Sequence, residues 1–255
     1  MITIKSQREL DLMKRAGEVV MRVHLRMLEL VVPGVTTFEL NRVAAEIIRQ
    51  AGAVPSFLGF PCSLGGIDFP GVICASCNEE VIHGLPGSRV LQEGDILSVD
   101  VGAILNGWHG DAARTYPVGR ISGEAARLLA VTEESFNRGM EAAIPGNRIR
   151  DVSAAVQRRV EENGFSAVRD FVGHGIGTEM HEEPQIPNYV CRERGPRLAE
   201  GMTLAIEPMV NAGIWKVNVL SDKWTVVTAD GALSAHHENT VAITAHGPVI
   251  LTQIW

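Results

Sequence analysis

Five ionisable residues stand in stretches that otherwise have the pattern of buried strand or glycine-rich turn: Asp100, Asp111, His174, Glu207 and Glu238. Asp100 lies inside the apolar run 96–104, and Glu207 lies inside the run 203–210. A buried carboxylate without a partner costs several kcal/mol in lost hydration, so each acid needs a compensating group. An arginine or a turn would serve for any one of them. Four carboxylates with one imidazole indicate instead a divalent cation such as manganese, iron or cobalt.

The spacing of the two aspartates adds geometry to this argument. Between them lies Asn106-Gly107, a strong signal for a two-residue hairpin turn of type I′. With these residues at the turn centre, Asp111 faces Gly102, which shares a face with Asp100 because strand side chains alternate. Both aspartates then project from one side of the ribbon, with backbones roughly 7–8 Å apart. That spacing suits two metal ions about 3.5–4 Å apart.

An internal repeat relates the two halves of the chain. Residues 91–100 align with residues 198–207, so that Asp100 matches Glu207. A second match runs through the preceding segments and consists of the pairs Gly34/Gly146, Leu40/Val152, Ala44/Val156, Ile48/Val160 and Gly52/Gly164. Apolar positions four residues apart, ended by a glycine, predict one amphipathic helix in each half. A repeat of this length predicts a pseudo-twofold architecture, with chance similarity as the alternative.

Caps and apolar periods define the remaining elements. Capping boxes at residues 6–9 and 36–39 open two helices, and the first is expected to bury Leu10, Met13, Val20, Val23 and Met27. The expected helices cover about 7–31, 37–51, 123–143 and 149–163, and later strands cover about 202–210, 223–229 and 235–244, with Asp230-Gly231 as a second hairpin turn. Repeated blocks of helices and antiparallel strands predict an α+β fold with helices on one side of a curved sheet.

Length and composition limit the class of protein. The 255 residues, with 45% hydrophobic content and no linker-like segment, predict a single domain, 1–255, with halves of about 1–118 and 119–255. No apolar run approaches about 18 residues, and residues 1–6 lack a signal-peptide core. The net charge of -7 comes without a basic block. We therefore expect neither membrane insertion nor nucleic-acid recognition.

Four cysteines, at positions 62, 74, 77 and 191, are too few for a disulfide framework and predict a reducing, cytoplasmic location. Cys74 and Cys77 form an isolated CxxC motif. Without a second Cys/His pair at zinc-finger spacing, the expected role of this motif is structural or pocket lining.

Several motifs, in chain order, resemble those of type I methionine aminopeptidases. They are residues 78–86 (NEEVIHGLP), 100–102 (DVG) with 110–111 (GD), 173–177 (GHGIG) with 180–184 (MHEEP), 206–208 (IEP), and Trp224 with 238–240 (ENT). That family has the pita-bread fold, an α+β pseudo-twofold structure with a two-metal site between its halves. The resemblance implies this fold and the removal of N-terminal methionine from nascent polypeptides, favouring a small second residue.

The resemblance also implies how two divalent ions, cobalt, manganese or iron, would be held. Asp111 and Glu238 would bridge both ions. Asp100 would complete one ion, while His174 and Glu207 would complete the other. Two such ions lower the pKa of a shared water towards neutrality and polarise a peptide carbonyl.

Catalytic roles beyond the metals follow from the same resemblance. His181 would stabilise the oxyanion, His83 would contact the scissile amide, and Glu207 would move a proton to the leaving nitrogen. His109, His236 and His237 adjoin the expected ligands and are expected to contact them, in a role that sequence alone does not assign. His24 and His246 are expected to be structural.

The pocket for the methionine side chain is expected from motif position to contain Phe57, Phe60, Cys74, Met180 and Trp224, together with His83 and His181. A soft apolar pocket suits a flexible thioether. Residues 62–71, which we call the long link, exceed the usual length at this place. Met180 and Asn239 also depart from common family choices, phenylalanine and histidine respectively. These departures bear on substrate preference, not on the metal ligands.

The resemblance implies a monomer that acts on nascent polypeptide N-termini, and it leaves a transient ribosome contact open. An Xaa-Pro aminopeptidase or prolidase shares the fold and ligands, but such enzymes usually carry an extra N-terminal domain, whereas the first helix here starts near residue 7. A type II methionine aminopeptidase would need a helical insertion in the second half. A catalytically silent peptide-binding module would be expected to have lost ligands, and all five are present.

Overall fold

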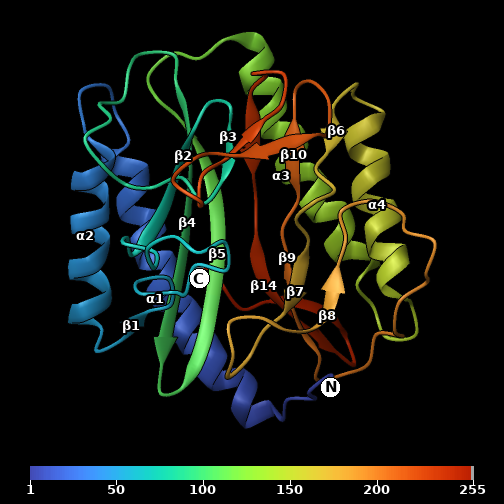
Figure 1. Ribbon diagram of the computed structural model, residues 1–255. Coiled ribbons are helices and arrows are strands. Elements are labelled where there is room, and N and C mark those ends of the chain that lie inside the picture. The colour runs from blue at the N-terminus through green and yellow to red at the C-terminus, as the bar shows by residue number, and fades with distance from the viewer. Residues whose placement is uncertain (254–255) are drawn as a thin grey trace.

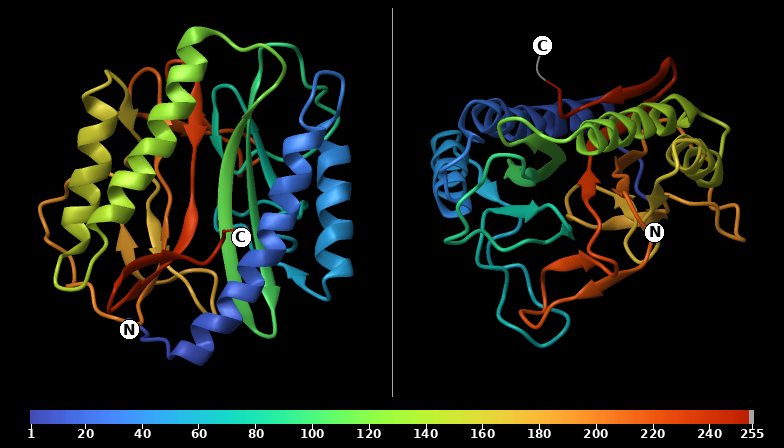
Figure 2. Two further views of the ribbon diagram at one scale, coloured as in Figure 1. Left: turned by 180° about the vertical axis from the view of Figure 1, so that it is seen from behind. Right: turned by 90° about the horizontal axis from the view of Figure 1, so that it is seen from above.

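The computed structural model describes residues 1–253, which form two groups of helices and strands lying side by side (Figure 1). Seen from above, α1 and α3 lie along the back of the strands, and α2 and α4 lie at the two flanks (Figure 2). The helices are α1 (Gln7–Leu30), α2 (Thr37–Gln50), α3 (Gly123–Ala142) and α4 (Ile149–Glu161). Each expected helix is therefore present, with ends within two residues of those predicted. None of the helices in 1–253 is long and apolar enough to cross a membrane.

The strands form four sheets among the described residues. In the first half, β4 (Ile96–Leu105) pairs with three strands, β1 (Val54–Pro55), β2 (Ile73–Cys77) and β5 (Trp108–Pro117). In the second half, the largest sheet has the order β15 (Gly247–Ile250), β14 (Asn239–Thr244), β9 (Thr203–Ile206), β7 (Gly173–Gly175) and β8 (Glu182–Ile186). Two smaller sheets have the orders β13 (Ser234–His236), β10 (Met209–Asn211), β6 (Ser166–Ala167) and β11 (Val217–Val219), β12 (Val226–Thr228), β3 (Glu80–Ile82).

The two N-terminal helices, α1 and α2, begin at the capping boxes that the sequence predicted. The side chain of Glu9 accepts a hydrogen bond from the Ser6 backbone N–H at 2.7 Å, and Glu39 does the same for Thr36 at 2.8 Å, so both capping boxes are present. The five expected inward residues of α1 are all buried. Gly17 lets α1 lie close to the rest of the fold, since a Cβ there would come within 2.3 Å of the Leu251 carbonyl oxygen.

The repeated segments have matching local structure. Gly34 and Gly146 have φ angles of 95° and 92°, in the left-handed region where glycine is favoured. The Gly34 N–H donates to the Leu91 carbonyl at 2.8 Å, and the Gly146 N–H donates to the Leu198 carbonyl at 2.9 Å. The apolar stripes of α2 and α4 are buried at every matched position, namely Leu40, Ala44, Ile48, Val152, Val156 and Val160. A pseudo-twofold relation, and not chance similarity, accounts for these equivalent bonds.

The hairpin of β4 and β5 has the predicted register. Gly102 faces Asp111, and Leu105 faces Trp108 across the turn. Asn106 and Gly107 have φ angles of 54° and 81°, as a type I′ turn requires. The two aspartates therefore lie on one face of this ribbon, as the alternation of side chains predicted.

The prediction of a second hairpin at Asp230-Gly231 is wrong. Residues 229–230 form a turn, and Gly231 has φ of 73°. However, the strands on either side enter different sheets, because β12 pairs with β11 and β3 whereas β13 pairs with β10. An Asp-Gly turn signal is local, but the pairing of the flanking strands is decided by which sheet can cover their apolar faces.

Hydrogen bonds join the two halves next to the acidic residues. The Glu238 N–H donates to the Ala113 carbonyl at 2.9 Å. The Asp111 N–H donates to the Thr240 hydroxyl oxygen at 3.1 Å, and that hydroxyl donates to the Asp111 carbonyl at 2.9 Å. These bonds run between β5 and the start of β14, so they bring Asp111 and Glu238 together across the seam.

Candidate metal centre and active site

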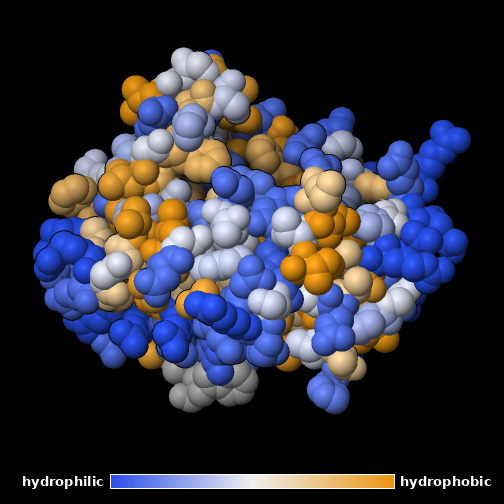
Figure 3. All heavy atoms as spheres, turned by 90° about the horizontal axis from the view of Figure 1, so that it is seen from below, coloured by the Kyte–Doolittle hydropathy of each residue, from blue (hydrophilic) through white to orange (hydrophobic). Residues whose placement is uncertain are grey.

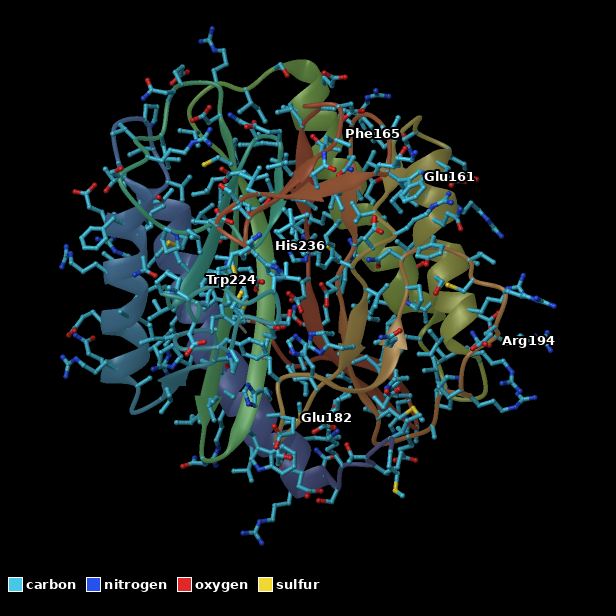
Figure 4. All side chains as sticks on the ribbon, viewed as in Figure 1. Glu161, Phe165, Glu182, Arg194, Trp224 and His236 are labelled. Carbon is cyan, nitrogen blue, oxygen red and sulfur yellow. The ribbon has the colours of Figure 1, made fainter. Side chains whose placement is uncertain are left out.

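A cavity of about 450 Å³ opens at the seam between the halves. All five predicted metal ligands line it, as do all seven residues predicted to contact the substrate. Trp224 and Glu182, which both line the cavity, come from separate segments of the chain (Figure 4). The cavity therefore gathers residues that span much of the sequence.

The centre of the acidic cluster is formed by Asp111, His174 and Glu238. One ligand atom from each lies within 4.8 Å of the other two. The Nε2 atom of His174 is 4.0 Å from Asp111 Oδ2 and 3.5 Å from Glu207 Oε1. Its other ring nitrogen, Nδ1, lies 2.8 Å from the Gly175 carbonyl oxygen, which leaves Nε2 turned towards the acids. Such an arrangement is typical of a metal-binding histidine whose other ring nitrogen is held by a backbone carbonyl.

Among the described residues, no arginine or lysine forms an ion pair with the four carboxylates, as the alternative to a metal site would require. Within residues 1–253, their ion-pair partners are the histidines His174 and His236, and no lysine or arginine takes that role. Arg114 donates to the backbone carbonyl of Glu238, not to its carboxylate. Four buried polar atoms have no hydrogen-bond partner in this part of the chain: Asp100 Oδ1, Asp111 Oδ1, Glu238 Oε1 and His236 Nε2. Buried carboxylate oxygens without a hydrogen-bond partner, all on residues that line one cavity, fit divalent cations.

Burial raises the pKa of every acid in the cluster, and repulsion between the carboxylates raises it further for Asp111, Glu207 and Glu238. Burial raises the pKa of Asp100 to about 7. Burial, followed by the charges of Glu238 and Asp100, raises the pKa of Asp111 well above its usual range. The pKa values of Glu207 and Glu238 rise in the same direction, chiefly through burial and then through neighbouring carboxylates. The cluster is thus unfavourable as bare anions, and bound cations would remove that penalty.

The two histidines predicted to contact the substrate, His83 and His181, both line the cavity. The His181 ring packs edge-to-face on Phe60, with centroids 5.5 Å apart, and on His174, with centroids 4.5 Å apart. His83 has φ of 58°, a left-handed conformation that is uncommon outside glycine and is often found at functional sites. Burial lowers the pKa of His83 to about 4 and also lowers that of His181. Both rings are therefore neutral near pH 7.

The apolar part of the cavity contains the predicted aromatic and sulfur residues. Cys74 and Met180 are buried, whereas Phe57, Phe60 and Trp224 are partly exposed. Sequence reasoning missed four further apolar lining residues, Phe69, Ile82, Phe171 and Val172. Phe69 belongs to the long link, whose isolated aromatic residue was the available signal. The other three gave no signal, because an apolar residue in or beside a strand has the same appearance in any core.

The CxxC motif does not form a paired thiol site. Cys74 faces Asp100 across the β2–β4 ladder and lines the cavity. Cys77 packs in the hydrophobic core of the first half. Their odd separation places them on opposite faces of the strand, and both are free cysteines. Pocket lining for one and a structural role for the other agree with the expectation from sequence.

His24, His109 and His236 each lie next to a polar group. His236 Nε2 lies 3.8 Å from Glu207 Oε2, and burial lowers the pKa of His236 to about 3. His109 Nδ1 lies 3.0 Å from the Ser56 hydroxyl oxygen. His24 bridges the Tyr116 hydroxyl at 2.8 Å and the Ala112 carbonyl at 2.9 Å, in the core behind β5. Of these, His236 has the most direct contact with the acidic cluster.

The site and the fold define a class. The sequence model of metallopeptidase family M24 matches residues 11–245, and the carboxylate-rich cavity between two pseudo-symmetric halves is that of a pita-bread metallopeptidase. Within this class, the chain belongs to the methionine aminopeptidases. It is 54% identical, over 254 residues that cover 100% of both chains, to a methionine aminopeptidase of Clostridium perfringens. It also superposes on the crystal structure of a methionine aminopeptidase from Thermotoga maritima with a TM-score of 0.95, at 45% identity and 100% coverage of both chains.

The alternative family is more distant. A prolidase from Pyrococcus furiosus matches with a TM-score of 0.79 and 22% identity, over 99% of this chain and 66% of that chain. This likeness shows a shared fold alone. The α+β pita-bread fold expected from the sequence is confirmed by both comparisons.

Proposed function

We propose that this chain removes the N-terminal methionine from nascent polypeptides by hydrolysis that depends on two divalent metal ions, favouring a small second residue. The proposal is carried by one observation, the buried cluster of four carboxylates and His174 beside an aromatic cavity. Family membership supports the peptidase activity. The small second residue is the family preference that the sequence motifs imply.

The proposed ligand roles agree with the arrangement of the cluster. Asp111 and Glu238, assigned as bridging ligands, belong to its compact centre. Glu207 lies beside His174, in keeping with a shared ion, and Asp100 lies on the same ribbon face as Asp111. Cobalt, manganese or iron suits oxygen ligands with a single imidazole. When bound, such ions lower the pKa of water and polarise the scissile carbonyl.

The other residues of the chain orient the substrate and handle protons. Neutral His181 carries one ring N–H and is assigned to donate it to the developing oxyanion. His83, which also lines the cavity, is assigned to the scissile amide. Glu207 borders the cavity and is assigned to pass a proton to the leaving nitrogen. The free substrate amine would bind beside Asp100. An internal peptide segment has no such amine, so the enzyme would act only at the N-terminus.

The apolar wall is assigned to the methionine side chain. Phe57, Phe60, Cys74, Met180 and Trp224 border the same cavity as the acids. Aromatic faces and sulfur make favourable contacts with a thioether, and an unbranched chain adapts to a narrow pocket. A cavity of about 450 Å³ falls within the range of small-ligand pockets.

A panel of free-amine peptides tests the proposal. We expect a Met-Gly peptide to be cleaved at least tenfold faster than Leu-Gly or Met-Leu peptides, because one misfit side chain costs about 10–200-fold in such pockets. Rates are measured as kcat/KM with added manganese or cobalt, and acetylated Met-Gly peptide serves as the control for the free amine. Equal rates across the panel would reject methionine selectivity.

Location and assembly complete the proposal. All four cysteines are free, in keeping with a reducing compartment, and we place the enzyme in the cytoplasm, where nascent chains emerge. We propose a monomer, because the assigned ligands and substrate contacts all come from one chain. A transient ribosome contact remains open within this proposal.

A further inference from the structure

The N-terminal segment 1–6 packs on the second half of the molecule, although the helix that follows it, α1, belongs to the first. Ile2 packs against the hydrophobic core formed by α3, α4 and the large sheet of the second half. The Lys5 N–H donates to the Gly201 carbonyl at 2.7 Å. The backbone at Lys5 is therefore fixed against the second half before α1 begins.

The side chain of Lys5 forms an ion pair with Glu182 that is largely shielded from water. The Lys5 Nζ atom lies 2.5 Å from Glu182 Oε2, and the two side chains are only 4% and 8% exposed. Glu182 lies at the lower end of the molecule (Figure 4), and hydrophilic residues cover much of that end when it is seen from below (Figure 3). Exposed charges would be ordinary there, whereas a buried pair has lost hydration and depends on good geometry.

The Glu182 carboxylate closes the loop 176–181, which connects β7 to β8 and carries His181. Its Oε1 atom accepts a hydrogen bond from the Thr178 N–H at 3.0 Å. Its Oε2 atom accepts from Lys5 and from the Thr3 hydroxyl. Burial works to raise the pKa of Glu182, but the hydrogen bonds from Lys5 and Thr3 outweigh it, and the pKa lies below its ordinary value. Glu182 is therefore an anion near pH 7, with both oxygens held.

Gly177, the last glycine of the GHGIG motif, makes room for this ion pair. A Cβ atom at Gly177 would lie 2.3 Å from Glu182 Oε1 and 2.7 Å from Lys5 Cε. The Gly177 carbonyl accepts a hydrogen bond from the His109 N–H at 2.9 Å, so β5 also holds the start of the loop. The glycine at this position is thus explained by the close approach of Lys5 and Glu182.

The His181 ring has few restraints of its own. Within residues 1–253 it makes no hydrogen bond, and its ring contacts are the edge-to-face ones with Phe60 and His174. Its orientation therefore depends on the backbone of the loop 176–181. That backbone is held across the loop by the Glu182 carboxylate.

We propose that Lys5 is a positioning residue for His181. By holding the Glu182 carboxylate, Lys5 fixes the loop 176–181 and so the direction in which His181 donates to the developing oxyanion. The inference rests on the proposed function, which gives His181 that role. Glu182 lines the cavity and Lys5 does not, so Lys5 acts through Glu182 and not on the substrate.

The expected effect of losing Lys5 falls on the chemical step. A misplacement of about 1 Å can cost about 10²-fold in rate. The oxyanion is present only in the transition state, so poor alignment of its donor lowers kcat and leaves KM unchanged. The metal ligands are not part of this network, and metal content should stay at the level of the unsubstituted protein.

The test begins with Lys5→Met, which keeps an unbranched side chain without the charge. With Met-Gly peptide and added manganese, we expect kcat to fall by about 10–10²-fold, with KM within about twofold and metal content unchanged. Lys5→Arg, which keeps the charge, should lose less. Thermal midpoints are recorded in parallel, and Glu182→Gln carries the same test from the other side of the ion pair if Lys5→Met does not fold.

A double-mutant cycle separates positioning from a general weakening of the fold. In a His181→Ala background, Lys5→Met should lower kcat by less than about twofold, because the residue that Lys5 positions is gone. Arg159→Met is the matched control. It removes a cation from an ion pair with Glu134, between α4 and α3, and neither residue lines the cavity. Its kcat should be unchanged in both backgrounds.

The outcomes distinguish this inference from the proposed function. An unchanged kcat in Lys5→Met, or an equal fall in both backgrounds, would overturn the inference and leave the proposed function standing. Loss of the metal ions from Lys5→Met would overturn it as well, since the effect would then arise at the metal site. Full kcat in His181→Ala alone would overturn the proposed role of His181, on which the inference rests.

Discussion

The two halves of the molecule deliver equivalent acids by different routes. In the first half, Asp100 and Asp111 stand on one hairpin whose two-residue turn sets their register. In the second half, Glu207 and Glu238 stand just beyond the end of the β9–β14 ladder, where Ile206 pairs with Asn239. Residues 208–237 separate them and form β10 to β13. The positions of two acids can thus be fixed by a two-residue turn, as in the first half, or by the 30-residue segment 208–237, as in the second.

The segment 208–237 and the other segments outside the repeat contribute the residues of the pocket. The segments matched by the repeat, 32–52 with 144–164 and 91–100 with 198–207, contain helices, turns and strands that frame the site. The pocket residues lie outside them, in the unmatched segments 53–90, 165–197 and 208–237. The repeated segments thus contribute one acid from each half, Asp100 and Glu207, whereas the pocket residues and His174 come from segments that differ between the halves. The predictions below test this division, from the largest effect to the smallest.

Metal removal should affect both halves at once. Exhaustive chelation is expected to abolish peptide hydrolysis, because ligands from both halves share the ions, and added Mn, Fe or Co should restore it. Activity and metal content are measured on the same samples, and magnesium, which keeps several of its waters, serves as a weaker comparison ion. Full turnover after complete metal removal would contradict the metal-dependent mechanism.

Substitution in an unmatched segment should separate chemistry from metal binding. His181→Ala is expected to lower kcat by about 10²–10³, the scale for losing one oxyanion donor, with metal content unchanged. Steady-state kinetics and elemental analysis provide the two readouts. His246→Ala is the control, because His246 is exposed and does not line the cavity. Loss of the ions from the His181 variant would show that His181 is part of the metal site.

Substitution in the matched helices should lower stability in both halves. Leu40→Ala in α2 is expected to lower the free energy of unfolding by about 2–5 kcal/mol, and Val152→Ala in α4 by less, because it removes fewer carbon atoms. Both side chains are fully buried. Urea denaturation measures each change, and Phe38→Ala, at a position 58% exposed, is the control expected to lie within about 0.5 kcal/mol. A neutral Leu40 variant would argue against a tightly packed stripe.

The pH dependence of the free energy of unfolding should differ between a variant in α1 and a variant in α3. When the two repeats are aligned as above, with Gly34 on Gly146, His24 in α1 corresponds to Phe136 in α3. Both side chains are buried. Burial, followed by the charge of Arg114, lowers the pKa of His24 to about 3 from 6.5. Between these values the unfolded chain binds a proton that the folded chain does not, so the free energy of unfolding falls as pH falls.

The contribution of His24 is at most about 1.4 kcal/mol per pH unit in that window. His24→Gln should therefore show a shallower loss of stability between pH 6.5 and about 4 than the unsubstituted protein. Other histidines with lowered pKa values, such as His83 and His109, act in both proteins alike. Parallel stability curves would show that His24 titrates normally, and Phe136→Leu provides a variant in the second half with no expected change in slope.

The sequence by itself determined the local elements and the chemistry of the site. Capping residues, apolar periods and the Asn106-Gly107 turn specify helices and one hairpin through interactions between near neighbours, so α1, α2, α3, α4 and the β4–β5 register were predictable. The five proposed ligands could also be selected from the sequence, because ionisable residues inside apolar runs require partners, and all five line one cavity.

Only the tertiary structure decided how distant segments meet. It placed β12 and β13 in different sheets, contrary to the prediction from Asp230-Gly231, and it turned Phe69 inward while its neighbours stay exposed. Neither outcome is encoded in a short pattern, because strand pairing and pocket lining depend on burial against surfaces contributed by residues far away in the chain. Local order follows from adjacent residues, whereas the shape of the pocket follows from the packing of the whole chain.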